Sequence, residues 1–193
     1  MKKKIVLKSM FIGILSLILT TPTMAKAYVI SRSGGFYYKP AYISCSSSFS
    51  QATLTAVHNA CVAWNNACTN GPVIYRTTST HNTTEYPCQN GFNEITKGDR
   101  TPEDYLMETY HVVEDHIYSY EVDIDINTLH DFGTASTSYH TQSAILHELG
   151  HMLGLHHSEN TSACMYGILS RGQVRGLHQD DINGINAIYD SRR

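Results

Sequence analysis

The segment ILHELGHMLGLHHSENTSACMYG, residues 145–167, carries four histidines within eleven residues, and their spacing restricts how this part of the chain can fold. On an α-helix, residues four apart lie about 40° from one another around the axis. His147 and His151 would therefore project from the same face, one turn apart. Apolar residues recur at helical spacing through the segment and predict a helix over about 140–153. They are Ala144, Ile145, Leu149, Met152 and Leu153.

A third histidine follows at a defined distance. Gly154 comes three residues after His151 and can adopt positive φ, so it can end the helix and turn the chain sharply. A residue three positions further on then returns towards the first two histidines. That residue is His157, and the extended motif favours it over its neighbour His156. His156 would face away from the site or line the cleft.

These residue types indicate a catalytic metal site. A structural zinc site fills all four positions, typically with thiolates, whereas a catalytic site uses three protein ligands and leaves one position for water. Glu148, adjacent to His147, would lie beside the metal as a general base. The alternative is an amphipathic helix that carries two histidines by chance. The glycine and third histidine at fixed offsets make such a coincidence far rarer.

The first 27 residues have the features of a secretory signal peptide. Three lysines precede an apolar run over residues 10–19, and the small-x-small sequence Ala25-Lys26-Ala27 follows. We expect cleavage after Ala27 and an extracellular mature chain, 28–193. A membrane anchor is the alternative, but the apolar run is shorter than the ~20 residues needed to span a bilayer.

The mature chain suits one catalytic domain, since it has the length for a single core and contains no internal repeat or low-complexity linker. It carries 9 basic and 17 acidic residues, a net charge of −8. Such a charge argues against nucleic acid or an anionic membrane as a partner. We expect a monomer.

All five cysteines lie in the mature chain, and export favours disulfides among the first four. Cys61 and Cys68 fall on one predicted helix, roughly 10 Å apart by its rise per residue, which is too far to bridge. Cys45 and Cys88 would then each pair with one of them, in an order that the sequence leaves open. Cys164 would be the odd thiol, packed as a small buried side chain.

The remaining segments predict an α+β fold, with strands and one helix first and two helices late. Ser50 is a candidate N-cap for a first helix that contains Trp64. Isoleucines at 182, 185 and 188 predict one buried face on a last helix that begins near Gln179. The predicted strands span 36–46, 72–80, 92–99, 108–114 and 118–126.

With these residues identified, the chain resembles the metzincins, which are defined by HExxHxxGxxH and a later methionine turn. Met165 lies eight residues beyond His157. Within the metzincins, it is most similar to the matrixins, the matrix-metalloproteinase family. The similar segments are GLHHS, Met165-Tyr166, LHQDDINGINAIY with Asp180 and Asp181, EVDIDIN at 121–127, and Trp64 in the first helix.

This resemblance implies a secreted zinc-dependent endopeptidase in two lobes. The upper lobe would be a twisted mixed sheet of about five strands with two long helices, and the C-terminal lobe, 155–193, would carry one helix. An extended protein or peptide substrate would lie antiparallel to an edge strand formed by 121–127. Met165 would form a hydrophobic floor beneath the metal, and Asp180 or Asp181 would hold the methionine turn.

The chain also departs from the family pattern. Residues 28–36 contain no cysteine and are too short for the blocking propeptide, so latency would be absent or achieved otherwise. The segment between Asn127 and His147 is short and lacks the structural-zinc histidines, so we expect one zinc ion. Asp123 matches a calcium-binding aspartate, which allows calcium there. Gly167-Ile168-Leu169 replaces the Pro-x-Tyr specificity wall, and the P1′ preference stays open.

Two other functions fit part of the pattern. One is a peptidase of narrow specificity that acts on a single partner, and the other is a secreted zinc-containing binding protein. The intact Glu148 argues against the binding protein, because ligand binding alone does not need a carboxylate beside the metal.

Overall fold

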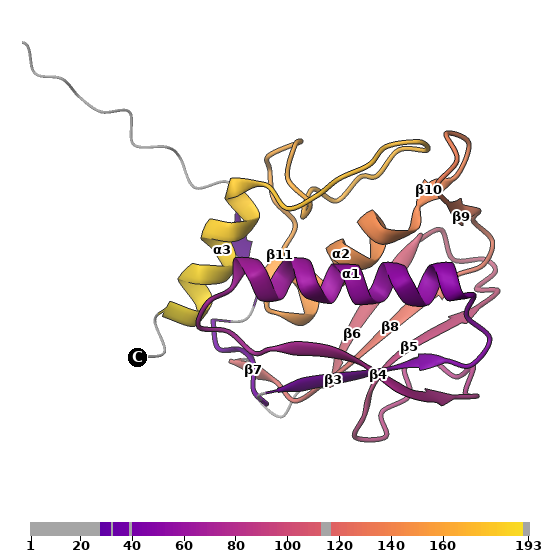
Figure 1. Ribbon diagram of the computed structural model, residues 1–193, viewed down its shortest axis with the longest axis horizontal. Helices are drawn as coiled ribbons and strands as arrows, with labels where there is room; N and C mark the ends of the chain where they lie inside the picture. Colours follow the sequence, from indigo (N-terminus) through magenta and orange to yellow (C-terminus); the bar gives the residue numbers. More distant parts are fainter. Residues whose placement is uncertain (1–27, 32, 39, 113–116, 191–193) are drawn as a thin grey trace, which may run out of the picture.

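The computed structural model describes residues 28–31, 33–38, 40–112 and 117–190, so the predicted signal peptide lies outside the described residues. Its centre is a five-stranded sheet with two long helices on one face and a third helix at one end (Figure 1). In spatial order the strands are β4 (Ile74–His81), β3 (Ala41–Ser46), β5 (Asn93–Gly98), β8 (Glu121–Asn127) and β6 (Met107–Val112). The first four run parallel, and β6 is the antiparallel edge strand.

The two long helices pack against each other over the sheet. Helix α1 (Gln51–Ala67) begins at Ser50, whose Oγ accepts from the backbone N–H of Thr53 at 3.1 Å. Helix α2 (Thr141–Met152) lies beside it, and the indole Nε1–H of Trp64 donates to the carbonyl of Leu146 at 2.8 Å. This buried bond fixes α1 against the middle of α2, because an unpaired indole N–H in the core would be costly.

Short strand pairs attach the remaining segments to this core. They are β1 (Val29–Ile30) with β11 (Leu155–His156), β2 (Gly35–Phe36) with β7 (Tyr118–Ser119), and β9 (Phe132–Gly133) with β10 (Tyr139–His140). Helix α3 (Gln179–Asp190) packs near the C-terminal end of α1. Its Tyr189 hydroxyl accepts from the N–H of Phe36 at 2.8 Å and donates to the carbonyl of Leu153 at 3.1 Å.

The predicted α+β class and five-stranded mixed sheet are confirmed, but three strand predictions were wrong. The stretch 36–46 contains parts of two strands, β2 and β3, which belong to different sheets. The stretch 118–126 forms two strands, β7 and β8, which belong to different sheets. The segment 121–127 is not an edge strand, because β8 is buried along its whole length between β5 and β6. Its acidic residues alternate with apolar ones, which is the usual sequence pattern of a strand with one face in solvent. In this structure the acidic face is buried as well, and the sequence pattern does not reveal what covers it.

Loops cover the second face of the sheet, and Cys88 lies on that face, away from the helix cysteines with which it was expected to pair. Ile95 and Ile124 point to the helices, so their neighbours Glu94 and Asp123 point to the opposite face. Cys88 lies with these two acids, and the sheet separates it from the α1 cysteines. Among the described residues, no two of the five cysteines form a disulfide. Burial raises the pKa of Cys45 to about 11 and that of Cys61 to about 12, which keeps both protonated.

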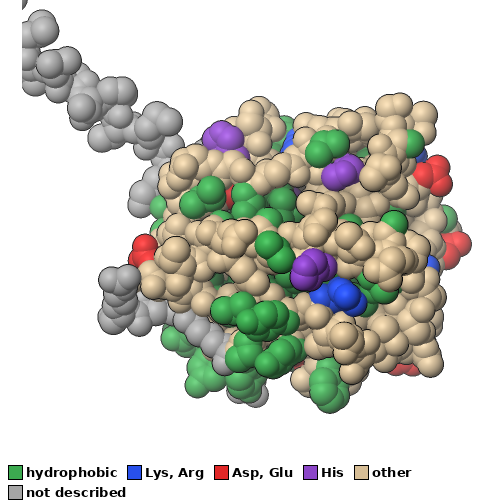
Figure 2. Space-filling view, viewed as in Figure 1, with side chains coloured by type: hydrophobic (Ala, Val, Ile, Leu, Met, Phe, Trp, Pro, Cys, Tyr) green, Lys and Arg blue, Asp and Glu red, His purple; other side chains and the backbone are tan. Residues whose placement is uncertain are grey.

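The face that carries α1 presents few charged side chains (Figure 2). Helix α1 itself contains no Asp, Glu, Lys or Arg. Among the described residues, no helix has the length and apolar character required to cross a membrane.

A buried ion pair supports the loop that leads into β6. Asp125 is fully buried on the loop-covered face of the sheet. It accepts from Arg100 at 2.8 Å (Nε) and 2.6 Å (Nη2), from the Thr96 hydroxyl at 2.6 Å and from the Tyr105 hydroxyl at 3.2 Å. These four donors compensate for removing the carboxylate from water. They also tie residues 100 and 105, just before the edge strand, to the sheet.

Arg100→Leu should lower the free energy of unfolding by about 3–5 kcal/mol, because it leaves the buried Asp125 carboxylate without its cation. Urea unfolding of residues 28–193 measures the effect. Arg171→Leu is the matched control, since its ion pair with Asp131 is exposed and 3.9 Å long and should contribute less than about 1 kcal/mol. Equal small losses in both variants would contradict the structural role of the pair.

Candidate active site

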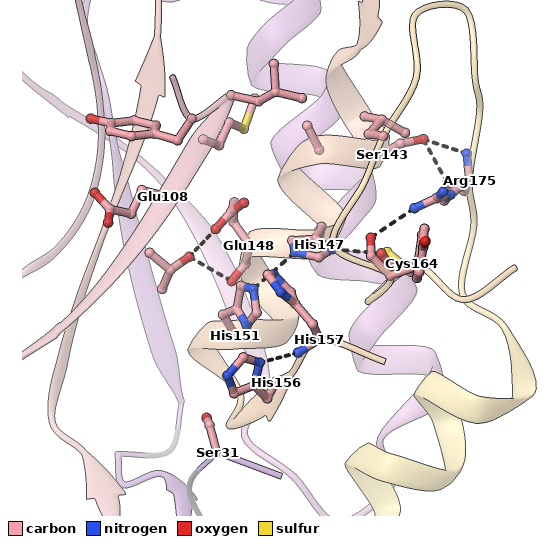
Figure 3. Close-up of a pocket in the computed structure, with 18 of the residues that line it drawn as sticks. Ser31, Glu108, Ser143, His147, Glu148, His151, His156, His157, Cys164 and Arg175 are labelled. Carbon is pink, nitrogen blue, oxygen red and sulfur yellow. Dashed lines mark hydrogen bonds between the residues drawn. The ribbon is translucent and has the colours of Figure 1, made fainter. Parts of the chain in front are cut away.

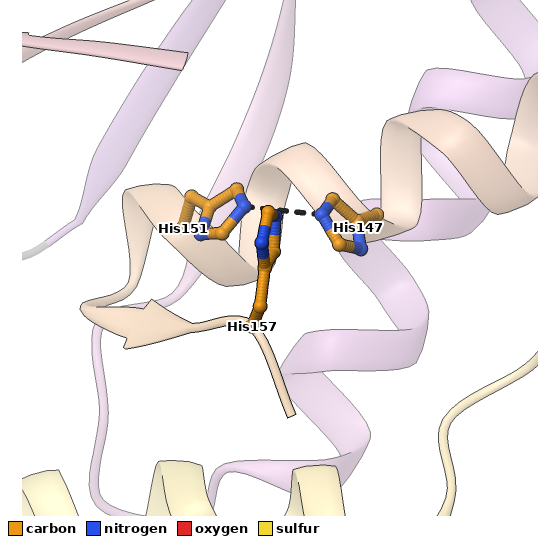
Figure 4. Close-up of side chains that lie close together, drawn as sticks. All are labelled: His147, His151 and His157. Carbon is orange, nitrogen blue, oxygen red and sulfur yellow. Dashed lines mark hydrogen bonds between the residues drawn. The ribbon is translucent and has the colours of Figure 1, made fainter. Parts of the chain in front are cut away.

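Three histidine side chains converge at the end of α2 (Figure 4). The ring centroids of His147 and His151 are 4.7 Å apart, and that of His157 lies 5.1 Å and 5.0 Å from them. One ligand atom from each lies within 4.8 Å of the others. Gly154, at φ 103°, follows the helix and turns the chain so that His157 approaches from the segment after β11.

The hydrogen bonds of the first two rings indicate where their lone pairs point. Nδ1 of His147 lies 2.8 Å from the carbonyl of Cys164, and Nδ1 of His151 lies 2.8 Å from the carbonyl of Leu155. A carbonyl only accepts, so each Nδ1 carries the proton and each Nε2 carries a lone pair. The two Nε2 atoms are 3.0 Å apart. Two lone pairs at that distance repel unless a cation lies between them, so this donor set fits a metal ion.

The protonation states agree with metal binding. Burial lowers the pKa of both His147 and His151 to about 4, and burial together with His156 lowers the pKa of His157. All three rings are therefore neutral near pH 7, which is the form of imidazole that binds a metal.

His156 is adjacent to this group but does not belong to it. Its main chain pairs with Val29 in the short β1–β11 sheet, and its Nδ1 accepts from the N–H of His157 at 2.6 Å. The His156 ring lines the cleft beside the three converging rings (Figure 3).

Glu148 is buried in the wall of the cleft, where a residue of the edge strand orients it. The hydroxyl of Thr109, on β6, lies 2.6 Å from Oε2 of Glu148 and donates to it, since an ionised carboxylate only accepts. Burial raises the pKa of Glu148, while His151 and this hydrogen bond act in the opposite direction. Thr109 was not found by sequence reasoning, because a threonine in a strand carries no local signal for contact with a helix 39 residues away.

The turn that contains Cys164 and Met165, called the methionine turn below, is anchored to α3 by one buried carboxylate. Asp181 is fully buried and accepts from the N–H groups of Cys164 at 2.8 Å, Met165 at 3.0 Å and His178 at 2.7 Å. Asp180 instead accepts from the Ser158 hydroxyl at 2.6 Å and from the N–H of Tyr28 at 3.1 Å.

Met165 packs under the histidine-bearing helix. A Cβ built on Gly150 would come within 2.2 Å of the Met165 sulfur and 2.9 Å of the Trp64 ring. The absence of a side chain at Gly150 therefore lets the methionine lie directly against α2. Burial raises the pKa of Cys164 well above its usual value, so this thiol is not an available nucleophile.

The cleft around the histidines has a volume of about 750 Å³. The edge strand β6 forms one wall, and the first turns of α2 with the segment after the methionine turn form the other. In this second wall lie Gly167, Leu169 and Arg175. Arg175 was not singled out by the sequence, because it lies in an irregular loop with no recognisable motif.

A second group lies on the other face of the sheet. Ligand atoms of Cys88, Glu94 and Asp123 come within 4.8 Å of one another. Asp123 accepts from the N–H groups of Cys88 at 2.7 Å and Gln89 at 3.2 Å. Calcium at Asp123 stays a prediction.

Comparison with known proteins agrees with this geometry. The family model described as Matrixin matches residues 44–190. Stromelysin-1 of Equus caballus is 52% identical over 46 residues, 22% of this chain and 10% of that protein. Metalloendoproteinase 1 of Glycine max is 42% identical over 55 residues, 28% of this chain and 18% of that protein. Matrilysin of Homo sapiens is 45% identical over 51 residues, 25% of this chain and 19% of that protein.

Fold and site together define a zinc metallopeptidase, in which a mixed sheet and a histidine-bearing helix bring together three histidines that could hold a metal ion. The family match covers most of the chain, and the chain belongs to the matrixin family. The matched stretches span 10–19% of the length of the three relatives named above, so their whole-protein activities do not transfer directly.

His157→Ala should weaken zinc binding by at least about 100-fold, since losing a ligand costs more than the 10–100-fold typical of losing a residue that supports one. Competition with a chromogenic chelator measures the affinity. His156→Ala is the matched control and should retain affinity within a few-fold. A larger loss of zinc affinity in His156→Ala than in His157→Ala would instead identify His156 as the third ligand.

Proposed function

We propose that this chain is a secreted, monomeric zinc-dependent endopeptidase that hydrolyses peptide bonds of extended protein substrates. The proposal rests chiefly on the two histidine Nε2 lone pairs that face each other at 3.0 Å beside a buried carboxylate. Zinc would be held by His147, His151 and His157. When bound, it would polarise the scissile carbonyl and lower the pKa of an attacking water molecule.

Glu148 would accept the proton from the attacking water and deliver it to the departing amine. The Thr109 hydroxyl holds Oε2 of this carboxylate, so the other oxygen is the one we assign to proton transfer. The carbonyls of Cys164 and Leu155 keep the first two imidazoles in their orientation. Met165 supports the helix from below.

The substrate would bind along β6. This strand ends the sheet, and its outer edge pairs with no other strand in the described part of the chain. An extended peptide could add there as an antiparallel strand, an arrangement that uses main-chain hydrogen bonds and tolerates many sequences. Thr109 would then place the scissile bond near Glu148.

Glu148→Gln should reduce cleavage of an unfolded protein substrate by at least about 100-fold while the protein still binds one zinc ion, because general acid–base catalysis contributes about 10²–10⁴-fold. Gel-based cleavage and metal analysis of both proteins test this. Full activity in Glu148→Gln would reject the assigned base. Zinc in both proteins without cleavage by either would favour the zinc-containing binding protein or the peptidase of narrow specificity.

We also propose that signal cleavage follows Ala27. Cleavage there would turn the N–H of Tyr28 into an ammonium group next to the Asp180 carboxylate, 3.1 Å away. A charged pair in this partly buried position is stronger than the neutral bond.

The secreted protein should therefore begin at Tyr28, which N-terminal sequencing and intact-mass measurement of the culture medium would reveal. A product that keeps residues 1–27, or that starts elsewhere, would contradict both the cleavage site and the pairing with Asp180.

A further inference from the structure

The part of the cleft beyond His147 contains an arginine that no acid neutralises. Arg175 is half-buried and lines the cleft together with Ser143 and Tyr166. Its Nη1 donates to the carbonyl of Tyr166 at 3.0 Å, and its Nη2 donates to Oε1 of Gln173 at 3.2 Å. Within the described ranges, no carboxylate lies within 4 Å of its guanidinium.

The main chain holds this cation in place. The Ser143 hydroxyl, in the first turn of α2, donates to the carbonyl of Arg175 at 2.9 Å and accepts from its N–H at 2.7 Å. The guanidinium also lies over the ring of Tyr166, 5.3 Å from its centroid. Its Nε–H is buried and has no hydrogen-bond partner. Arg175 is therefore held at its main chain and at its guanidinium, yet some of the guanidinium N–H donors have no partner in the protein.

The direction of β6 shows which side of the scissile bond this arginine faces. His111, near the C-terminal end of β6, bonds the hydroxyl of Ser119 at 2.7 Å, and Ser119 pairs with Phe36. The same N-terminal segment reaches the end of α2, where the N–H of Ser31 donates to the carbonyl of Gly154 at 2.9 Å. The C-terminal ends of β6 and α2 thus lie at one end of the cleft, and their N-terminal ends lie at the other.

A peptide antiparallel to β6 would therefore enter over His111 and leave over Met107, on the side of Ser143 and Arg175. The first residue after the scissile bond would have its side chain next to Arg175. Apart from Glu148 on α2, the acids that line the cleft are Asp104 and Glu108, and both come from the opposite wall. Figure 3 shows Glu108 and Arg175 on opposite sides of α2.

Resting on the proposed peptidase function, we propose that Arg175 makes this pocket select an acidic side chain, glutamate above all, immediately after the scissile bond. A carboxylate would accept charge-assisted hydrogen bonds from the guanidinium donors that the protein leaves unused. A leucine there would desolvate the cation without compensation, and a lysine would repel it.

The test uses zinc-loaded residues 28–193 and peptides that differ only at the residue after a single cleavage site, which is Glu, Gln, Leu or Lys. Mass spectrometry locates the cut, and kcat/KM is measured for each. The wild type should prefer Glu over Leu by at least about 10-fold and disfavour Lys most.

Arg175→Gln should abolish the preference for Glu over Leu, and Arg175→Glu should favour Lys. Arg171→Gln, four residues earlier in the same loop but outside the cleft lining, should leave the order unchanged. Thermal unfolding of each variant checks that the fold is retained. A wild type that prefers Leu, or an order unaltered in Arg175→Gln, would overturn the proposal while the peptidase function stands.

A wild type that cleaves none of the peptides, nor an unfolded protein, would instead refute the peptidase function. Fluorescein-labelled versions of the same peptides then decide the role of Arg175 by anisotropy. Tighter binding of the Glu peptide that is lost in Arg175→Gln supports an acid-selective pocket, and equal binding of the Glu and Leu peptides refutes it.

Discussion

Two imidazole nitrogens whose lone pairs face each other at 3.0 Å impose the central constraint on this molecule. Such an arrangement is unfavourable without a cation, so other contacts must hold the rings in place. The carbonyls of Cys164 and Leu155 do this by fixing each Nδ1–H. Leu155 follows the turn at Gly154, and Cys164 directly precedes Met165, so the segment after α2 orients the two imidazoles that the helix supplies.

Two buried carboxylates, each hydrogen-bonded to several donors, hold the elements around the site in place. Asp181 receives three backbone N–H groups and thereby joins the methionine turn to α3. Asp125 receives Arg100 and two hydroxyls and thereby steadies the loop before β6. One network lies beneath the histidines and the other beside the edge strand. A buried carboxylate without its donors would be strongly unfavourable. The donors must therefore stay in place, and this holds the two walls of the cleft in one defined geometry.

Much of the fold and part of the site could be predicted from local patterns. Helical periodicity located the three helices that the described residues contain, and Ser50 was found as a cap because capping depends on residues only three positions apart. The strand 121–127 was misplaced because its partners and its loop cover come from distant segments. The same holds for Cys88, which pairing rules assigned to the helix cysteines although the sheet separates them.

Local sequence was sufficient to predict the helical offset of His147 and His151, the glycine that permits the turn, and the return of a histidine three residues later, because these features depend on backbone geometry over one or two turns. Local sequence did not reveal that Thr109 contacts Glu148, that Asp181 rather than Asp180 holds the methionine turn, or that Arg175 lies in the cleft. The contacts of Thr109 and Asp181 join residues between 16 and 39 positions apart, and they form only when separate elements pack together.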